Sequence, residues 1–401
     1  NHGIFSFGET AKLSYQRMIN LVNTAEKALQ RKVNLDFTNS LESSNNSNII
    51  IPYLRGLIGR ISKKYCTNNN WIFDIRNNEN TKELFCHQEL NSLINKGVAT
   101  PDHVIRTKAK PLLLESFVPD KNKSFEEKIY NWVHNAKEKI NKYIMEYEDY
   151  FERNSKFSKE AKTQLDPLPR LILIPGIGLI GIGINKKSSK VAADIGQAWI
   201  ETVLSATSIG DFNPVSEKDT FDLEYWSLEQ AKLGKNKPPL LSGKIIAITG
   251  AGGVIGSQIA RQFKNAGAEV IAIDLDKKSA NLIANSIGDN TLAIGCDITN
   301  KKALENTFDE IIRNFGGLDI LISNAGAAWE GSISKMNESL FRKSMEINLF
   351  AHYYVSKFAI NIFHSQDFCE EDKKNLIGGQ ILFNISKQAI NPGPNFGSYG
   401  I

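Results

Sequence analysis

Four glycines between an apolar run and a helical pattern form the clearest candidate binding site in this sequence. They are Gly250, Gly252, Gly253 and Gly256, and they follow the apolar run 245–248. Glycine adopts positive φ angles and lets a phosphate group approach the backbone closely. The free N–H groups and the dipole of a helix N-terminus favour an anion at the same point. The pattern therefore predicts a strand, a turn and a helix that bind the pyrophosphate of a dinucleotide.

Two aspartates follow this turn at the ends of later predicted strands. Asp274 closes the second strand, 18 residues after Gly256. A carboxylate there can accept both ribose hydroxyls of NAD and would repel the 2′-phosphate of NADP, so we expect NAD as the cofactor; the alternative is that Asp274 only caps its strand. Asp297 ends the third strand, where it either hydrogen-bonds the adenine amine or is a plain turn residue.

From this turn onward the sequence resembles the short-chain dehydrogenase/reductase family. The matching motifs are Thr249-Gly250-(three residues)-Val254-Ile255-Gly256, Asp297, Asn324-Ala325-Gly326, Asn348, Ser386 and Tyr399, the last two being 13 residues apart. One departure is Val254, where the family usually has glycine. A Cβ at this position makes the path of the loop less predictable, and Gly253 beside it would compensate.

The resemblance implies a chemical role for each polar residue. Tyr399 would take the hydroxyl proton of an alcohol as hydride leaves carbon, and Ser386 would hold the substrate oxygen beside it. Free tyrosine has a pKa of about 10, so the family makes this hydroxyl more acidic with a Lys one helical turn later. Asn348 would hold a water in the proton relay. Asn324 and Gly326 would line the cofactor pocket.

Each of these residues also has a plainer interpretation. Ser386 alone would be any loop serine, Tyr399 any buried tyrosine, and Asn348 a residue that bonds a helix backbone. The Lys is expected four residues after Tyr399, past the end of the given sequence. We therefore expect a piece of a longer protein, with an incomplete dehydrogenase sheet and little or no dehydrogenase activity of its own.

The opening Asn1-His2-Gly3 resembles the last metal-binding segment of the class II (zinc) aldolases. In that family one His joins an upstream His-x-His pair, so the resemblance implies that His2 is a metal ligand and that the pair precedes residue 1. Three protein ligands and an open position suit a Lewis acid that stabilises an enediolate. The alternative is that a lone His at this place has no role.

The order of motifs along the whole chain resembles bifunctional aldolase/short-chain dehydrogenase proteins, which include rhamnulose-1-phosphate aldolase/lactaldehyde dehydrogenases. The resemblance implies retro-aldol cleavage of a ketose phosphate, followed by oxidation of the aldehyde product in rhamnose catabolism. The motifs between the two ends are 101–108, 174–178 and 221–226. The first contains Asp102, His103, Arg106 and Lys108, which either bind a sugar phosphate or form a solvated loop.

The expected domains are an end of an aldolase-like domain at 1–30, an aldolase-associated α/β region at 31–234 and an NAD-binding domain at 241–401. Two alternatives stay open: a stand-alone dehydrogenase with an accessory domain, and a non-catalytic NAD-binding scaffold. An upstream His-x-His pair would favour the bifunctional enzyme over the stand-alone dehydrogenase. A residue other than Lys four positions after Tyr399 would favour the non-catalytic scaffold.

Composition limits the partners. The 401 residues are 41% hydrophobic and carry a net charge of +4, without a basic tail, which argues against nucleic acid. The longest apolar stretch, 171–184, is shorter than the roughly 20 residues of a membrane span. The four cysteines form no CxxC pair and suit a reducing, cytoplasmic location.

We expect a small-molecule substrate, a sugar phosphate or hydroxy-aldehyde, and a homo-oligomer. Four histidines without ligand spacing are interpreted as structural or surface residues: His87, His134, His352 and His364.

Alternating patterns after a linker at 235–239 predict the elements that position these residues. They indicate a Rossmann-type doubly wound parallel sheet, truncated at its C-terminal end and preceded by an aldolase-related α/β region. The expected strands are 244–249, 269–273, 291–295, 318–322 and 380–385, with helices at 255–266, 301–315 and 337–364. Before the linker we expect a strand at 4–7, helices within 8–30 and at 123–154 and 187–206, and two buried strands within 171–184.

Overall fold

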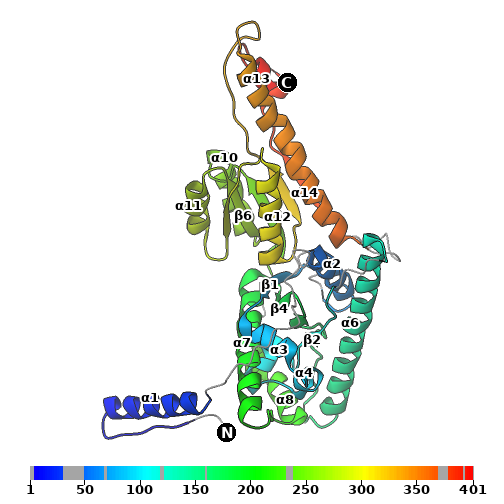
Figure 1. The fold of residues 1–401 in the computed structure, drawn as a ribbon, viewed down its shortest axis with the longest axis vertical. Helices are drawn as coiled ribbons and strands as arrows, with labels where there is room; N and C mark the ends of the chain where they lie inside the picture. The colour runs from blue at the N-terminus through cyan, green and yellow to red at the C-terminus, as the bar shows by residue number, and fades with distance from the viewer. Residues whose placement is uncertain are drawn as a thin grey trace.

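Two sheets organise the protein. The computed structural model describes residues 4–29, 49–66, 70–117, 122–158, 160–231, 238–368, 378–391 and 393–400. A four-stranded sheet has the order β1-β4-β3-β2, and a five-stranded sheet has the order β7-β6-β5-β8-β9. Helices flank both sheets (Figure 1). The α/β architecture predicted from the sequence is therefore confirmed.

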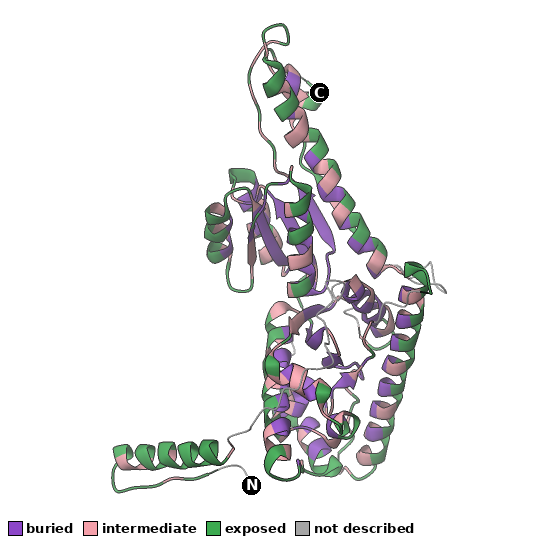
Figure 2. Ribbon diagram, viewed as in Figure 1, coloured by how far each residue is buried: buried purple, intermediate pink, exposed green. Residues whose placement is uncertain are grey.

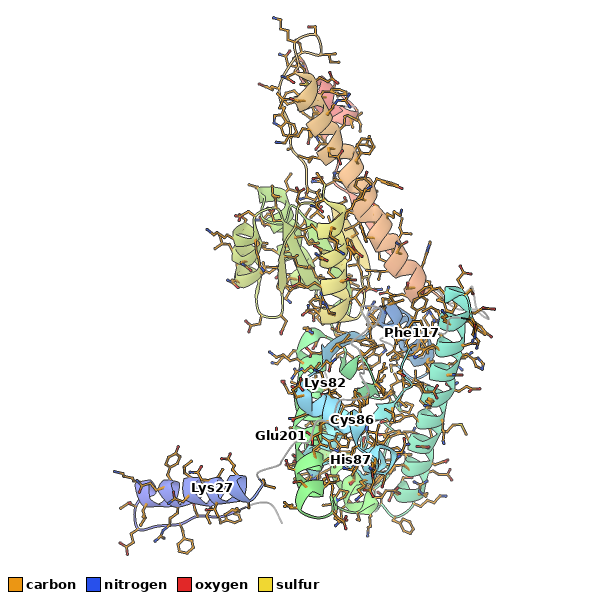
Figure 3. All side chains as sticks on the ribbon, viewed as in Figure 1. Lys27, Lys82, Cys86, His87, Phe117 and Glu201 are labelled. Atoms are coloured by element: carbon orange, nitrogen blue, oxygen red, sulfur yellow. The ribbon has the colours of Figure 1, made fainter. Side chains whose placement is uncertain are left out.

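The N-terminal segment lies apart from both sheets. Helix α1 (Ala11–Ala28) has no buried residue, and its side chains, including Lys27, project into solvent (Figure 3). Residues 4–8 have no regular structure, so the strand predicted over 4–7 is wrong. A strand needs a paired neighbour, whereas this segment folds back on α1 through side chains: Arg17 donates to the Phe7 carbonyl at 2.8 Å.

The four-stranded sheet contains the apolar stretch that the sequence analysis assigned to two strands. Strands β3 (Leu171–Ile174) and β4 (Gly178–Gly183) pair antiparallel and are fully buried. Gly176, with φ of +88°, makes the turn between them. The remaining strands are β1 (Ile72–Arg76) and β2 (Leu112–Leu113). None of the described helices is long and apolar enough to cross a membrane.

Two long helices cover this sheet. Helix α6 (Phe125–Ser155) begins with a capping box between Ser124 and Glu127, which satisfies free N–H groups of its first turn. Helix α7 (Lys186–Ile209) packs against β4, and Figure 2 shows that both bury one side and expose the other. The shorter helices are α2 (Ile50–Ser62), α3 (Glu79–Cys86), α4 (Leu90–Lys96), η2 (Pro101–His103), α5 (Val104–Thr107), α8 (Glu217–Glu224) and α9 (Ser227–Ala231).

The five-stranded sheet is parallel throughout, as predicted. Its strands are β5 (Ile245–Thr249), β6 (Glu269–Asp274), β7 (Leu292–Gly295), β8 (Ile320–Ser323) and β9 (Gln380–Phe383). The chain leaves β7 at one edge and returns to β8 beside β5, so the strand order reverses at β5. Ligands bind beyond the carboxyl ends of the strands at such a reversal in doubly wound sheets.

The helices of this sheet lie close to their predicted positions, with two differences. Helix α11 (Lys277–Ile287) was not predicted; Asp276, whose side chain accepts from the Lys278 and Ser279 N–H groups, is the N-cap that signals it. The helix predicted over 337–364 is interrupted by a π-helical turn, η3 (Glu346–Phe350). The others are α10 (Val254–Asn265), α12 (Lys301–Phe315), α13 (Glu338–Met345), α14 (Ala351–Gln366), η4 (Lys387–Ala389) and α15 (Gly397–Gly400).

One hydrophobic core extends through both sheets. It joins Phe73 of β1 to Phe315 at the end of α12 and to β5 and β6. The backbones of α2 and α14 meet so closely that a Cβ on Gly56 would lie 1.9 Å from the Gln366 carbonyl oxygen. No side chain fits at that crossing. The two sheets are therefore packed as one unit at this boundary.

A buried ion pair closes the same boundary. Arg55 of α2 donates to both carboxylate oxygens of Asp319, at 2.8 and 3.2 Å, and the two residues are only 3% and 2% exposed. Arg55 also donates to the Trp71 carbonyl and to Gln366 Oε1. Asp319 accepts the N–H of Ile245 at the start of β5. Bidentate, charge-assisted bonds of this kind fix geometry as well as charge.

Replacing Arg55 should destabilise the whole described core. Arg55→Met removes the bidentate partner of the buried Asp319 carboxylate and leaves Lys244, 3.9 Å away; breaking a buried pair typically costs about 3–5 kcal/mol. The free energy of unfolding from urea titrations checks this. Arg153→Met is the control, because Arg153 and Glu217 form an exposed pair of the kind that contributes about 0–1 kcal/mol. Equal losses in the two variants would contradict the assignment.

Candidate functional site

The glycine turn after β5 has the shape that the sequence predicted. Gly250 has a φ of +64°, a left-handed conformation that favours glycine. A Cβ on Gly256 would lie 2.1 Å from the Gly250 carbonyl oxygen, and one on Gly252 would lie 2.6 Å from the Ser279 Cβ. Gly253, the N-cap of α10, has an ordinary φ of −74°. Glycine at 250, 252 and 256 therefore permits the tight path of the turn into α10.

Val254 does not change the path of this turn. It is the first residue of α10, and its side chain is 85% exposed. The Cβ that distinguishes it from the family's glycine points into solvent and does not touch the turn. Gly253 is consequently not required to compensate for it, contrary to the expectation from the sequence.

Alanine substitutions should distinguish glycines at which a Cβ would clash with the backbone from a glycine at which it would not. Gly256→Ala must displace the Gly250 backbone and should lower the free energy of unfolding by about 1–3 kcal/mol. Gly253→Ala is the matched control, because the nearest atom to its new Cβ lies 3.4 Å away, an ordinary contact. Thermal unfolding of both variants measures the difference. A Gly256→Ala variant as stable as Gly253→Ala would show that the turn is looser than described.

The two predicted aspartates lie at the carboxyl ends of neighbouring strands. Asp274 ends β6 and accepts the Gly252 N–H at 2.9 Å, so its carboxylate touches the glycine turn. Asp297 follows β7 and accepts from the backbone N–H and the hydroxyl of Thr299, at 2.9 and 2.7 Å. The described contacts of Asp297 are those of a turn residue, and its contact with adenine stays a prediction.

Asn324 connects β8 to the glycine turn. Its side-chain Nδ2 donates to the carbonyls of Thr249 and Gly250, at 2.9 and 3.3 Å. Its backbone N–H donates to Thr249 Oγ1 at 3.0 Å, and its Oδ1 accepts from Asn384 Nδ2. Gly326 lies two residues on, where a Cβ would be 3.2 Å from Asn348 Oδ1. Of the two residues predicted to line the pocket, Asn324 is thus held at the turn and Gly326 lies beside Asn348.

Asn348 lies in the π-helical turn η3. Its Oδ1 accepts the Ala327 N–H at 3.1 Å, and its Nδ2 donates to the Ala327 carbonyl at 2.8 Å and to Ser344 Oγ at 3.1 Å. The plainer interpretation, a bond to a helix backbone, is wrong, because the partner is the loop after β8. Single π-helical turns are frequent at functional sites, and this one turns Asn348 toward the loop.

Ser386 and Tyr399 occupy short elements after β9. Ser386 Oγ accepts the Gln388 N–H at 3.2 Å and so begins η4. Tyr399 lies on α15, which is tied to α13 by a bond from Ser344 Oγ to the Ser398 carbonyl. Ser344 therefore links the Tyr399 segment to Asn348. In the described part of the chain no hydrogen bond joins the Ser386 and Tyr399 side chains, and their catalytic roles stay predictions.

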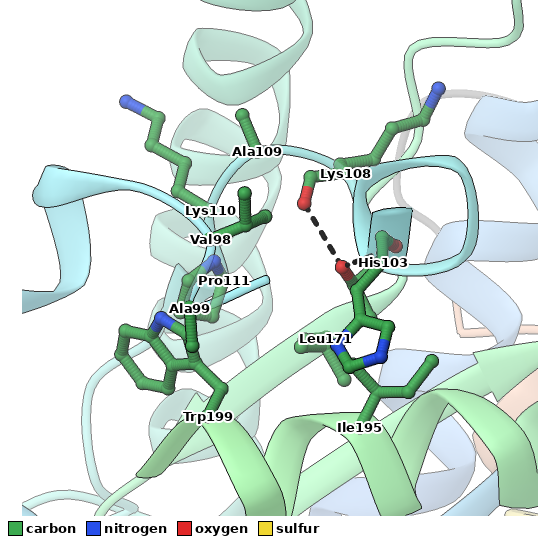
Figure 4. Close-up of a pocket in the computed structure, with 11 residues that line it drawn as sticks. Val98, Ala99, His103, Lys108, Ala109, Lys110, Pro111, Leu171, Ile195 and Trp199 are labelled. Atoms are coloured by element: carbon green, nitrogen blue, oxygen red, sulfur yellow. Dashed lines mark hydrogen bonds between the residues drawn. The ribbon is translucent and has the colours of Figure 1, made fainter. Parts of the chain in front are cut away.

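Lys108, in the polar motif 101–108, does not have the surroundings of a phosphate ligand. Lys108 is buried, with its Nζ 2.9 Å from Tyr147 Oη and 3.4 Å from Glu224 Oε1, and burial lowers the pKa of its ammonium group. Figure 4 shows its side chain directed away from the neighbouring pocket, which His103 lines. Because Glu224 already balances this charge, Lys108 is neither a phosphate ligand nor part of a solvated loop.

The expected metal site cannot be placed. His2 lies outside the described residues. Within the described ranges no group of three or more His, Cys, Asp or Glu side chains is arranged to hold a metal ion.

His352 is a polar residue beside the site that the sequence analysis assigned only to structure or surface. Its Nδ1 lies 2.6 Å from Ser323 Oγ at the end of β8. The signal for it was its position four residues after Asn348, which places both side chains on one face of the helix.

Comparison with known proteins identifies two family segments in this chain. Residues 45–233 match "Aldolase class II, second domain", and residues 244–400 match "short chain dehydrogenase". An uncharacterized oxidoreductase, YuxG, of Bacillus subtilis (strain 168) is 27% identical over 99% of this chain and 56% of its own length. The 7alpha-hydroxysteroid dehydrogenase of Escherichia coli (strain K12) is 35% identical over 40% of this chain and 59% of its own.

Some solved structures resemble part of this chain. One is a 7 alpha-hydroxysteroid dehydrogenase complexed with NADH and 7-oxo glycochenodeoxycholic acid, 33% identical with a TM-score of 0.36, covering 40% of this chain and 60% of that chain. The chain spans somewhat more than half the length of the curated relatives described above, 56% and 59%.

Proposed function

We propose that the five-stranded sheet binds NAD and that the protein is an oxidoreductase acting on an alcohol or aldehyde. The proposal takes account of both matching segments, the class II aldolase second domain and the short-chain dehydrogenase domain. The observation that carries this proposal is the glycine turn after β5 with Asp274 bonded to it. Turn and carboxylate together match the phosphate and ribose ends of a dinucleotide.

The residues present fit the cofactor. The tight turn needs glycine, because a Cβ on Gly250, Gly252 or Gly256 would lie within 3 Å of other atoms of the protein. The N-terminus of α10 would face the phosphates with its unpaired N–H groups. Asp274 would exchange its bond with Gly252 for bonds to the ribose hydroxyls, and it would repel a 2′-phosphate. Asn324 would keep the turn closed from the β8 side.

NAD, when bound, supplies a hydride acceptor. The chain's own part is then to position the substrate oxygen and to move one proton. Ser386 Oγ would hold that oxygen, and Tyr399 Oη would take the hydroxyl proton. Asn348 is held by Ala327 and Ser344, and in this proposal it supports the path by which the proton leaves.

The substrate class follows from the other half of the chain. A class II aldolase segment beside a dehydrogenase supports a sugar-derived hydroxy-aldehyde, such as the aldehyde product of a ketose-phosphate cleavage. The YuxG relative, which matches across both segments, supports treating them as parts of one longer bifunctional protein. A zinc ion bound through His2 belongs to the same proposal.

Exchanging Asp274 should change the cofactor preference. The full chain is expected to bind NADH more tightly than NADPH, and Asp274→Ser should reduce that preference at least about tenfold, because it removes both the ribose acceptor and the repelling charge. Enhanced NADH and NADPH fluorescence on titration with protein measures both dissociation constants.

Asp289→Asn is the matched control, since it removes an exposed carboxylate away from the turn. The proposal fails if the unaltered chain binds neither dinucleotide. If binding occurs but Asp274→Ser leaves the preference unchanged, the assignment of Asp274 fails instead.

A further inference from the structure

The loop after β8 is held from two opposite sides. Alternate residues of the extended segment 323–327 face the helix formed by η3 and α14. Ser323 Oγ lies 2.6 Å from His352 Nδ1, and Ala327 bonds to Asn348 through both its N–H and its carbonyl. Asn324, between these contacts, faces the other way and donates to the glycine turn.

The same ring also contacts the loop two residues later. The Ala325 backbone hydrogen-bonds to the ring and favours its protonated form, against the larger effect of burial on the pKa. His352 therefore contacts the loop at Ser323 and at Ala325, the residues on both sides of Asn324.

The surroundings of the ring favour its neutral form. His352 is half-buried, and burial is the largest effect, lowering its pKa. Ser323 is buried at the end of β8, and the Phe383 ring of β9 lies 6.1 Å from the imidazole, centre to centre. A neutral imidazole has one donor and one acceptor, so Nδ1 forms its bond with the Ser323 hydroxyl either as donor or as acceptor.

We propose that His352 is a positioning residue of the dinucleotide pocket, which fixes the 323–325 backbone so that Asn324 closes the glycine turn. The inference rests on the proposed function, because it assigns to His352 a part in NAD binding. His352 does not touch the turn itself. Its effect passes through Ser323 and Ala325 to Asn324, and from there to Thr249 and Gly250.

Dinucleotide affinity and loop protection test this role on the full chain. His352→Phe keeps a ring but loses both bonds, and it should weaken NADH binding about tenfold. Without NADH, it should also speed amide hydrogen exchange in a peptide covering 320–330. His352→Asn places an oxygen near the Nδ1 position, and it should restore part of the affinity by accepting the Ser323 hydroxyl.

Two further variants, Tyr353→Phe as a control and Ser323→Ala as a change in the bonding partner, separate the role of His352 from a general effect on the helix. Tyr353→Phe alters the next residue of α14, whose side chain is 59% exposed, and it should change neither measurement. Ser323→Ala should weaken NADH binding alone but add little to His352→Phe, because the two residues share one bond. If His352→Phe does not fold, His352→Asn and Ser323→Ala carry the same test.

The outcomes distinguish the two proposals. No NADH binding by the unaltered chain overturns the proposed function. NADH binding that His352→Phe, His352→Asn and Ser323→Ala all leave unchanged overturns the role of His352 alone. A lower melting temperature with unchanged NADH affinity and unchanged exchange at 320–330 also overturns it, since that result marks a purely structural residue.

Discussion

The buried pair of Arg55 and Asp319 connects the two halves of this protein at the point where the five-stranded sheet begins. Asp319 immediately precedes β8 and also accepts the first N–H of β5, so one carboxylate fixes the starts of the two strands that lead to the site. Arg55 balances its charge from α2, in the other half of the chain. A charge so deeply buried is tolerated only with such a partner, and the five-stranded sheet therefore depends on a residue of the other half of the chain.

Strands β5 and β8, which start at the buried ion pair, end at the candidate site, where hydrogen bonds again fix their relative positions. β5 ends at the glycine turn, and β8 ends at Ser323, with Asn324 bonded across to the turn. The helix formed by η3 and α14 holds the far side of this loop through Asn348 and His352, and its C-terminal end reaches Gln366, which accepts from Arg55. A single set of packed elements thus links the boundary between the sheets to the geometry of the glycine turn.

Much of this arrangement could be read from particular residues. The run 245–248 followed by spaced glycines predicted β5, its turn and α10, because strand periodicity and glycine conformation are local properties. The expectation that Lys108 binds a phosphate or lies in a solvated loop was wrong because its surroundings depend on residues distant in the sequence. A lysine beside Pro101 and Asp102 looks solvated in sequence, but Glu224 and Tyr147 reach it from distant segments and make its burial possible. Helix α11 was missed although Asp276 gave a local capping signal for it.

The sequence alone determined the order and kind of elements around the glycine turn and singled out Asp274, because glycine turns and strand ends depend on neighbours along the chain. Asn324 and Asn348 were singled out by the family resemblance of their motifs. Only the tertiary structure decided that Arg55 meets Asp319, that Asn348 bonds the loop at Ala327, and that His352 joins it there. These contacts connect residues up to 264 positions apart, and a long-range partner leaves no mark in the local pattern, because side-chain burial and hydrogen bonding are settled only when the elements pack.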